Sequence, residues 1–483
     1  MSSVHRSLVL SALSKYLNMG VTLASVVIFS RLLTPDELGI HVVAVAIAAL
    51  AIEVRLLGTG GYLIRKEVVT REDCQRVIGV TMAISFPLGA LMFATSTWVG
   101  SMFEAKGVDT ILAILSLGFV TAPFISVSRS VLSKNFRFDI LMINNVLSTL
   151  VTFLASLCAF FLGAGYTCLA IGLVVGQFSK LFFFMFVNSL EISWKPSLKG
   201  AREVFKFGLF VAQASLLRKL AETSPEIIIG KLGSPALAAI FSRSVGLYKF
   251  FFDSVNSAVQ PVVMPYLAKA KKNKTDLSSS YLNAVTHLSI LIIPILCVLS
   301  LVAEPAILLM FGEQWLESVE FVPILCLWGI LKSLYCWANT MLVTAGFEKS
   351  NYYRQIAITS STVLLCYLAY SHGLIYVAWA LVATACIDNI LLGIALRKHC
   401  NVRFREVFKS HSKSFIVGGA CSVATFLLDR MLNFEQLLPL IVLLVLSVTI
   451  PIIWLGTVIA LGHSIADIPL TLLGRINKRL KAY

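Results

Sequence analysis

Four cations interrupt two consecutive apolar segments of the chain. Arg218 and Lys219 lie in the first segment, and Arg243 and Lys249 lie in the second. A charged group at bilayer depth costs at least about 2.5–3.5 kcal/mol, so these side chains must meet water, a bound group or one another. In a cavity of low dielectric, Arg and Lys make strong charge-assisted hydrogen bonds to phosphate and carboxylate groups. These residue types therefore predict anion binding inside a membrane.

The polar residues of both segments follow helical spacing. On the first segment one arc of about 100° holds Ser215, Arg218, Lys219, Glu222 and Glu226. On the second, a four-then-three spacing aligns Ser242, Gly246, Lys249, Asp253, Asn256 and Gln260. Helices that are polar on one side must turn that side toward water, a substrate or each other. The pattern predicts a polar, net cationic cavity, in which Glu222 positions or neutralises Arg218 four residues away.

Charged residues also occur in the two N-terminal apolar segments. Lys15 belongs to a polar stripe that fits helix packing and cavity lining equally well, and its amine can also extend to the membrane surface. Glu53 and Arg55 point about 200° apart on a helix, so only one of them can face a shared cavity. Arg55 is the candidate, and a structural pairing with an acid elsewhere is the alternative.

Composition places these helices in a membrane protein. Apolar residues make up 58% of the 483 residues, charged residues make up 13%, and the mean hydropathy is +0.86. Apolar segments of about 20 residues follow one another to the C-terminus, each long enough for a membrane-spanning helix. We expect an all-α protein with fourteen spans: 8–30, 38–63, 77–101, 109–131, 139–163, 167–189, 204–230, 236–262, 281–303, 319–345, 354–371, 374–396, 413–429 and 437–461.

The net charge of +15 indicates topology. Alternate loops hold 28 Lys and Arg residues, and the other loops hold four. This asymmetry predicts cytoplasmic termini and an even number of spans. The basic loops are expected to contact anionic lipid headgroups, and nucleic acid binding is not expected. The first apolar segment is expected to be a permanent helix, because Lys15 interrupts it and no cleavage site follows.

Enzyme motifs are absent from the sequence. It contains no phosphate-binding loop, no zinc-protease motif, no nucleophile elbow and no Cys/His metal spacing. The outside loops are too short for a catalytic domain. The chain is therefore expected to be neither an enzyme nor a metal protein. The ten cysteines, most of them inside spans, are expected to be small apolar packing residues.

A turn motif recurs 200 residues apart. SRLLTPDELG at 30–39 is matched by GKLGSPALA at 230–238, and each turn follows a polar-striped helix. An offset of six spans preserves orientation, which predicts parallel repeats related by an axis along the membrane normal.

Several isolated residues have structural interpretations. Lys332 and Asp388 are expected to form a structural pair or a local cap. The segment AEPAILLMFGEQWLES predicts a short interfacial helix with Trp315 at headgroup level. Pro87 and Pro123 predict kinks within spans. Three histidines are expected to pack or to form hydrogen bonds and not to relay protons: His41, His287 and His463.

Several segments together resemble the bacterial polysaccharide-transport family, the oligosaccharide flippases of the multidrug/oligosaccharidyl-lipid/polysaccharide exporter superfamily. They are SRLLTPDELG, VFKFGLFVAQASLL, IIIGKLGSPALAAIFSRSVGL, QPVVMPYLAKAKKN and AEPAILLMFGEQW. The resemblance implies two six-helix lobes in a V, as in multidrug and toxin extrusion transporters, plus two C-terminal helices. The corresponding limits are 1–195 for the first lobe, 196–400 for the second, and 401–483 for the last two spans and a cytoplasmic tail.

The resemblance also implies a function. Family members move undecaprenyl-pyrophosphate-linked oligosaccharides across the bacterial inner membrane by alternating access, for surface polysaccharide synthesis. Spans one, two, seven and eight would line the cavity, with Lys15, Arg55, Arg218, Lys219, Arg243 and Lys249 as substrate-binding candidates. No cofactor is expected, coupling to a proton or sodium gradient is left open, and the polysaccharide polymerase machinery is a further expected partner. The alternative is a multidrug antiporter that uses acids for organic cations: Glu53, Glu222, Glu226 and Asp253.

Overall fold

The computed structural model describes residues 2–56, 62–63, 66–103, 106–187, 195–272, 277–463 and 465. Nearly all of these residues are helical, and none of them is in a strand, as expected for an all-α protein. The predicted cytoplasmic tail lies outside the described residues. Contacts divide the chain into two compact units, Met1–Ser242 and Arg243–Tyr483, so that α10 contributes to both.

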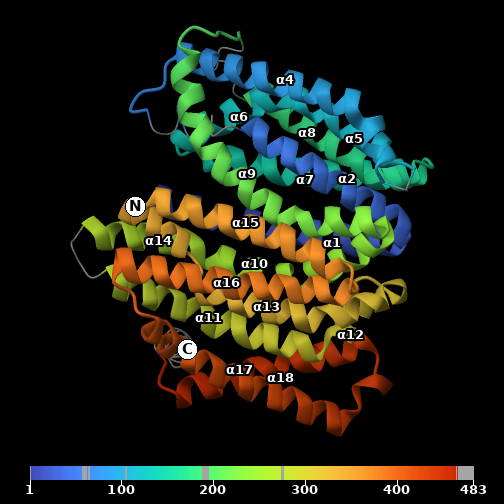
Figure 1. The fold of residues 1–483 in the computed structure, drawn as a ribbon, viewed down its shortest axis with the longest axis vertical. Helices are drawn as coiled ribbons and strands as arrows, with labels where there is room; N and C mark the ends of the chain where they lie inside the picture. Colours follow the sequence, from blue (N-terminus) through green and yellow to red (C-terminus); the bar gives the residue numbers. More distant parts are fainter. Residues whose placement is uncertain are drawn as a thin grey trace, which may run out of the picture. The chain divides into compact units, whose positions relative to one another are not determined.

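Unit 1 is a bundle in which helices adjacent in sequence pack together. Figure 1 shows α7 and α8 side by side, and α9 packs along α2 although about 150 residues separate them. The helices of this unit are α1 (Ser2–Leu32), α2 (Pro35–Leu56), α4 (Arg71–Ser101), α5 (Val108–Ser116), α6 (Gly118–Lys134), α7 (Phe138–Phe161), α8 (Cys168–Val187), α9 (Ala201–Leu232) and the start of α10 (Pro235–Lys272), with a 3₁₀ helix at Gly165–Thr167.

Unit 2 is a second bundle, in which α11 and α17 pack together, as do α15 and α16 (Figure 1). Its remaining helices are α11 (Leu277–Leu301), α12 (Ala303–Met310), α13 (Val322–Leu334), α14 (Ala338–Ala345), α15 (Glu348–Tyr370), α16 (Leu374–Cys400), α17 (Phe404–Leu432) and α18 (Pro439–Ala460), with 3₁₀ helices at Glu313–Phe321 and Phe434–Gln436.

Many of these helices can cross a membrane. Within the described part of the chain, nine candidates are long and apolar enough, and the bent pair α5–α6 makes a tenth. The long helices that do not pass this test are the polar ones, α1, α9, α10 and α15. A multi-pass membrane protein is therefore established, and the number of candidate spans is smaller than the predicted fourteen.

The predicted span 109–131 is a broken helix, because α5 and α6 meet at an angle of 41°. Pro123 has no N–H for the carbonyl of Phe119, which instead accepts a hydrogen bond from Ser85 Oγ at 2.6 Å. The carbonyl of Gly118 accepts from Thr121 Oγ1 at 2.9 Å. Side chains thus satisfy carbonyls that a helix break would leave unpaired in lipid. By contrast, α4 runs unbroken through Pro87.

The predicted span 319–345 is also interrupted. Helix α13 ends at Leu334, and α14 begins after Trp337, whose φ of 60° is left-handed. A bulky side chain is rarely found in this conformation. The helix is therefore interrupted at Tyr335–Trp337, where the sequence has no Pro or Gly, although Glu313–Ala345 as a whole is one candidate span.

The two turns that share a sequence motif also share their local structure. Thr34 and Glu37 form a reciprocal cap at the start of α2, with N–H to side-chain distances of 3.0 and 3.3 Å. Ser234 Oγ accepts from the N–H of Leu237 at 3.2 Å at the start of α10. The turns touch, since a Cβ on Gly39 would come within 2.0 Å of the carbonyl oxygen of Pro235. Only glycine fits this position.

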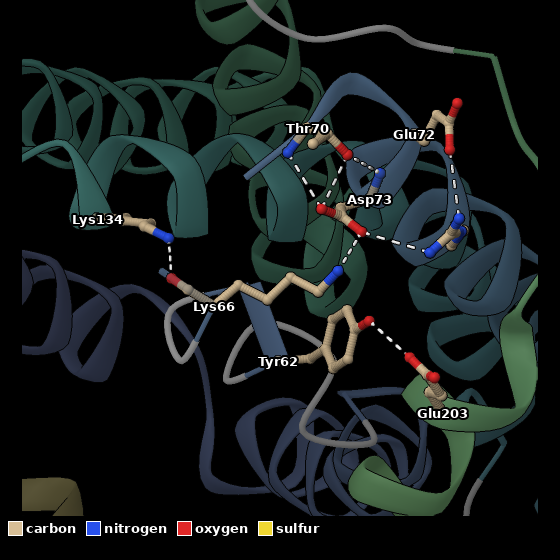
Figure 2. Close-up of polar contacts among 8 residues, drawn as sticks. Tyr62, Lys66, Thr70, Glu72, Asp73, Lys134 and Glu203 are labelled. Carbon is tan, nitrogen blue, oxygen red and sulfur yellow. Dashed lines mark hydrogen bonds and ion pairs between the residues drawn. The ribbon is translucent and has the colours of Figure 1, made fainter. Parts of the chain in front are cut away.

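A charged network holds one end of unit 1 together (Figure 2). Lys66 Nζ lies 2.5 Å from Asp73 Oδ1, and this hydrogen bond raises the pKa of Lys66 above its usual value. Asp73 also caps α4 through Thr70, and Lys134 of α6 donates to the carbonyl of Lys66. Tyr62 reaches α9, donating to Glu203 Oε2 at 3.3 Å. The cations of this loop therefore have protein partners.

Candidate functional site

The polar stripe predicted on α9 is accessible along its length. Arg218 and Glu222 are exposed, and Lys219 is half-buried with its amine 3.5 Å from Glu222 Oε2. Thr223 and Ser224, next along the helix, are buried. A helix with such a side in lipid must face water or a ligand there, because exposed charge in hydrocarbon is costly.

Glu226 continues this stripe to the start of α10. Its Oε1 accepts a hydrogen bond from Ser242 Oγ at 3.1 Å. The acid that lies nearest the turn is thus tied to the next helix, which leaves Glu222 as the more exposed acid beside Arg218 and Lys219.

The stripe on α10 is accessible as well. Gly246, Asp253 and Gln260 are exposed, whereas Lys249 is half-buried. Leu247 and Tyr248 between the first two of these are buried, and Phe250, Phe251 and Phe252 are half-buried. Three of the predicted stripe positions on α10 are thus exposed, and whether they face a cavity stays a prediction.

Arg243 lies against aromatic rings of unit 2. Its guanidinium carbon is 5.2 Å from the Trp315 ring centre and 5.5 Å from that of Phe311. Trp315 is fully buried in the protein, and its depth in the membrane stays a prediction. The adjacent Ser244 explains the packing, since its Oγ donates to the carbonyl of Ser318 at 2.6 Å and draws the 3₁₀ helix onto α10.

Arg55 is buried inside unit 1, with 9% of its surface exposed. Its Nη1 donates to the carbonyl of Gly118 at 3.3 Å, and the guanidinium lies 4.8 Å from the Phe119 ring centre. These partners are at the break between α5 and α6. These partners favour the structural role that the sequence left open for Arg55, with a carbonyl and a ring in place of an acid.

Lys15 and Glu53 are the remaining charged residues that the sequence analysis selected in the first two helices. Lys15 is exposed and Glu53 is half-buried. Next to Lys15, Ser14 is buried and accepts from Asn18 Nδ2 at 3.5 Å. The stripe on α1 thus includes both packing and accessible positions, and its members before residue 14 have undescribed side chains.

A buried cation in unit 2 was missed by the sequence interpretation. Arg354 is 7% exposed, forms an ion pair with Asp388, and donates to Asn339 Oδ1 at 2.6 Å and Asn351 Oδ1 at 3.2 Å. The expected partner of Asp388, Lys332, instead lies 4.4 Å from the ring centre of Trp328. The sequence feature that could have indicated this cation is Asp388, an acid alone in an apolar span, because a buried acid requires a nearby cation.

Sequence comparison assigns the family. A model described as polysaccharide biosynthesis protein matches residues 28–320, more than half of the chain. The chain belongs to this family. The resemblance noted in the sequence is thereby confirmed, and the match covers the residues from the first turn motif to the 3₁₀ helix after α12.

Curated relatives of this family are similar over most of their length. Teichuronic acid biosynthesis protein TuaB of Bacillus subtilis (strain 168) is 24% identical over 377 residues, 77% of each chain. Succinoglycan biosynthesis transport protein ExoT of Rhizobium meliloti (strain 1021) is 23% identical over 344 residues, 70% of this chain and 68% of its own.

Solved structures show a shared fold. Lipid II flippase MurJ in an inward closed conformation aligns with a TM-score of 0.70 at 14% identity, covering 91% of this chain and 98% of its own. An inward-facing multidrug resistance MATE family transporter aligns with a TM-score of 0.65 at 16% identity, covering 79% and 95%. The helical fold is therefore that of membrane transporters of these two kinds.

Proposed function

We propose that this protein is a flippase that moves a lipid-linked oligosaccharide across the bacterial inner membrane for surface polysaccharide synthesis. The accessible cations of α9, Arg218 and Lys219, carry the proposal, because a membrane helix with such a face requires a polar partner. The family, and relatives named for polysaccharide biosynthesis and transport, support a glycan-bearing substrate. The likeness in fold to a lipid flippase is consistent with it.

Arg218 is suited to the diphosphate that links lipid and sugar. Its planar guanidinium can donate two parallel hydrogen bonds to phosphate oxygens, and it is exposed. Glu222 lies within one turn and already attracts Lys219, so it can balance the cations when no substrate is bound. The polyprenyl tail would stay in lipid while the headgroup crosses by alternating access, and Lys15, Arg243 and Lys249 are further candidate contacts.

The proposed membrane arrangement has fourteen spans, with both termini cytoplasmic. Ten candidates are apolar, and α1, α9, α10 and α15 would complete the set, since they have 31, 32, 38 and 23 residues. Their polarity fits helices that line a cavity. The matching caps at Thr34 and Ser234 support parallel repeats. The lobe limits 1–195, 196–400 and 401–483 remain part of this proposal.

A multidrug antiporter is the second candidate function. Exposed acids on the same stripes, Glu222 and Asp253, would suit an organic cation, and a multidrug transporter has a similar fold. Glu222 has a nearby cation in Lys219, which reduces its availability. The cationic face therefore favours an anionic substrate.

Glycan export by point variants tests the flippase. In a strain that lacks the wild-type gene, we expect Arg218→Ala to abolish surface glycan and Arg218→Lys to retain part of it. Lysine keeps the positive charge but cannot donate two parallel hydrogen bonds as a guanidinium can. Arg202→Ala is the matched control, since Arg202 is exposed on α9 about 160° away around the helix.

The same strains separate the two functions. Wild-type glycan staining in both Arg218→Ala and Lys219→Ala would remove these residues from the site. A normal glycan together with increased drug susceptibility in the deletion strain would favour the antiporter instead.

A further inference from the structure

A basic pocket lies where α16 joins α17. It has a volume of about 490 Å³ and is lined by Arg397, Asn401, Arg403, Phe404 and Arg405. Its arginines are exposed. Three arginines and an amide provide many hydrogen-bond donors, and the lining contains no acid.

The backbone of this pocket is held in place by packing. Asn401 ends α16 in a left-handed conformation with φ of 56°, and the N–H of Val402 returns to the carbonyl of Leu396 at 3.3 Å. Val402 is 1% exposed. Phe404 packs so closely on Gly393 that a Cβ there would lie 2.2 Å from its ring. The arginines thus project from a turn anchored on both sides.

The charge of this pocket is not balanced by neighbouring acids. Among the described residues, no ion pair involves Arg397, Arg403 or Arg405. The one acid in the turn, Glu406, accepts a hydrogen bond from the backbone N–H of Arg403 at 2.9 Å and so caps α17. The start of α4 differs, because Lys66 of the preceding loop lies within ion-pair distance of Asp73 (Figure 2), as does Arg76 of the same helix.

The position of the pocket indicates the source of its ligand. It joins two candidate membrane spans, Leu374–Cys400 and Phe404–Leu432, so it lies at a membrane surface. Basic pockets between membrane helices bind anionic lipid headgroups, and guanidinium groups match phosphate oxygens geometrically. We propose that the pocket at Arg397, Arg403 and Arg405 binds the phosphate of an anionic phospholipid headgroup.

This lipid site is separate from the proposed transport site. A bound headgroup would hold the α16–α17 turn at the membrane surface through charge-assisted hydrogen bonds. The inference does not depend on the proposed function, because any membrane protein with this turn would present the same donors. Its test therefore measures lipid binding and not glycan export.

Native mass spectrometry of the full-length protein in detergent tests the site by titration with phosphatidylglycerol. We expect Arg403→Gln combined with Arg405→Gln to weaken binding of the tightest lipid about tenfold or more, since each basic residue near a membrane surface is worth about 1 kcal/mol. The control is Arg129→Gln combined with Arg202→Gln, which removes the same charge from exposed positions elsewhere. We expect it to change the affinity for the tightest lipid less than threefold. Equal losses in the two double variants would overturn the proposal.

Two further arms complete the test. Arg403→Lys combined with Arg405→Lys keeps the charge and should bind phosphatidylglycerol more weakly than wild type, which decides the matter if the Gln variant does not fold. Unchanged affinity in this Lys variant would contradict recognition by guanidinium groups. Inorganic pyrophosphate at the lipid concentration should leave the lipid bound, and full displacement would assign the pocket to a soluble phosphate instead.

Discussion

Arg55 and Arg218 belong to two helices of the same unit that pack together, α2 and α9, and their surroundings differ. Arg55 is buried, donates to a carbonyl at the α5–α6 break and stacks on Phe119. Arg218 is exposed on the polar face of α9. The first cation has partners within the fold, whereas the second is exposed.

This difference separates two reasons for charge in a membrane helix. A broken helix leaves carbonyls unpaired, and in lipid they must be satisfied from within the protein. Arg55 donates to such a carbonyl, so its guanidinium is used within the protein. A cation without such a partner requires water or a substrate, which is why we propose Arg218 as a substrate contact.

The buried pair in unit 2 provides the largest expected effect on stability. In Asp388→Asn, Arg354 loses its counter-charge while remaining buried. We expect the variant to be destabilised by about 3 kcal/mol, because an unpaired buried charge is costly. Thermal unfolding in detergent measures the change.

The matched variant is Asp388→Asn combined with Arg354→Met, which removes both charges and should recover most of the lost stability. No recovery would mean that Arg354 has a role other than its pairing with Asp388. In that case the two classes of cation could not be separated by burial.

A smaller loss of stability is expected when Arg55 is truncated. Arg55→Ala removes one donor to the Gly118 carbonyl and the contact with Phe119, while Thr121 still donates. We expect a loss of about 2 kcal/mol, the scale of one charged hydrogen bond. Thermal unfolding checks this, with Arg218→Ala as the comparison. A larger loss of stability in Arg218→Ala than in Arg55→Ala would invalidate the distinction.

The sequence predicts the fold class and the family. It also predicts which residues share a stripe on α9 and on α10, because that depends only on helix geometry, and the exposure of Arg218 and Asp253 is consistent with those stripes. The sequence does not predict the partner of Arg55, because the freed carbonyl of Gly118 lies 63 residues away. Nor does it predict the burial of Trp315, since a tryptophan near a span end suits both an interface and a core.

The breaks in two predicted spans show a related limit. Pro123 indicates a kink, yet the bend occurs at the α5–α6 junction before it. The turn at Trp337 has no Pro or Gly, and its left-handed residue is a buried tryptophan. Asp388 signals a partner without identifying it, because Arg354 is on another helix.

Binding of substrate by the purified protein tests the central claim most directly. A lipid-linked oligosaccharide diphosphate is titrated into wild type, Arg218→Ala and Arg202→Ala, and the three affinities are compared. The thermal stability of each protein is measured first, so that only folded variants are compared. We predict that Arg218→Ala binds at least about tenfold more weakly, the scale of one charge-assisted hydrogen bond, and that Arg202→Ala binds as wild type does. Equal affinity in all three proteins would contradict a cationic face on α9 as the substrate site.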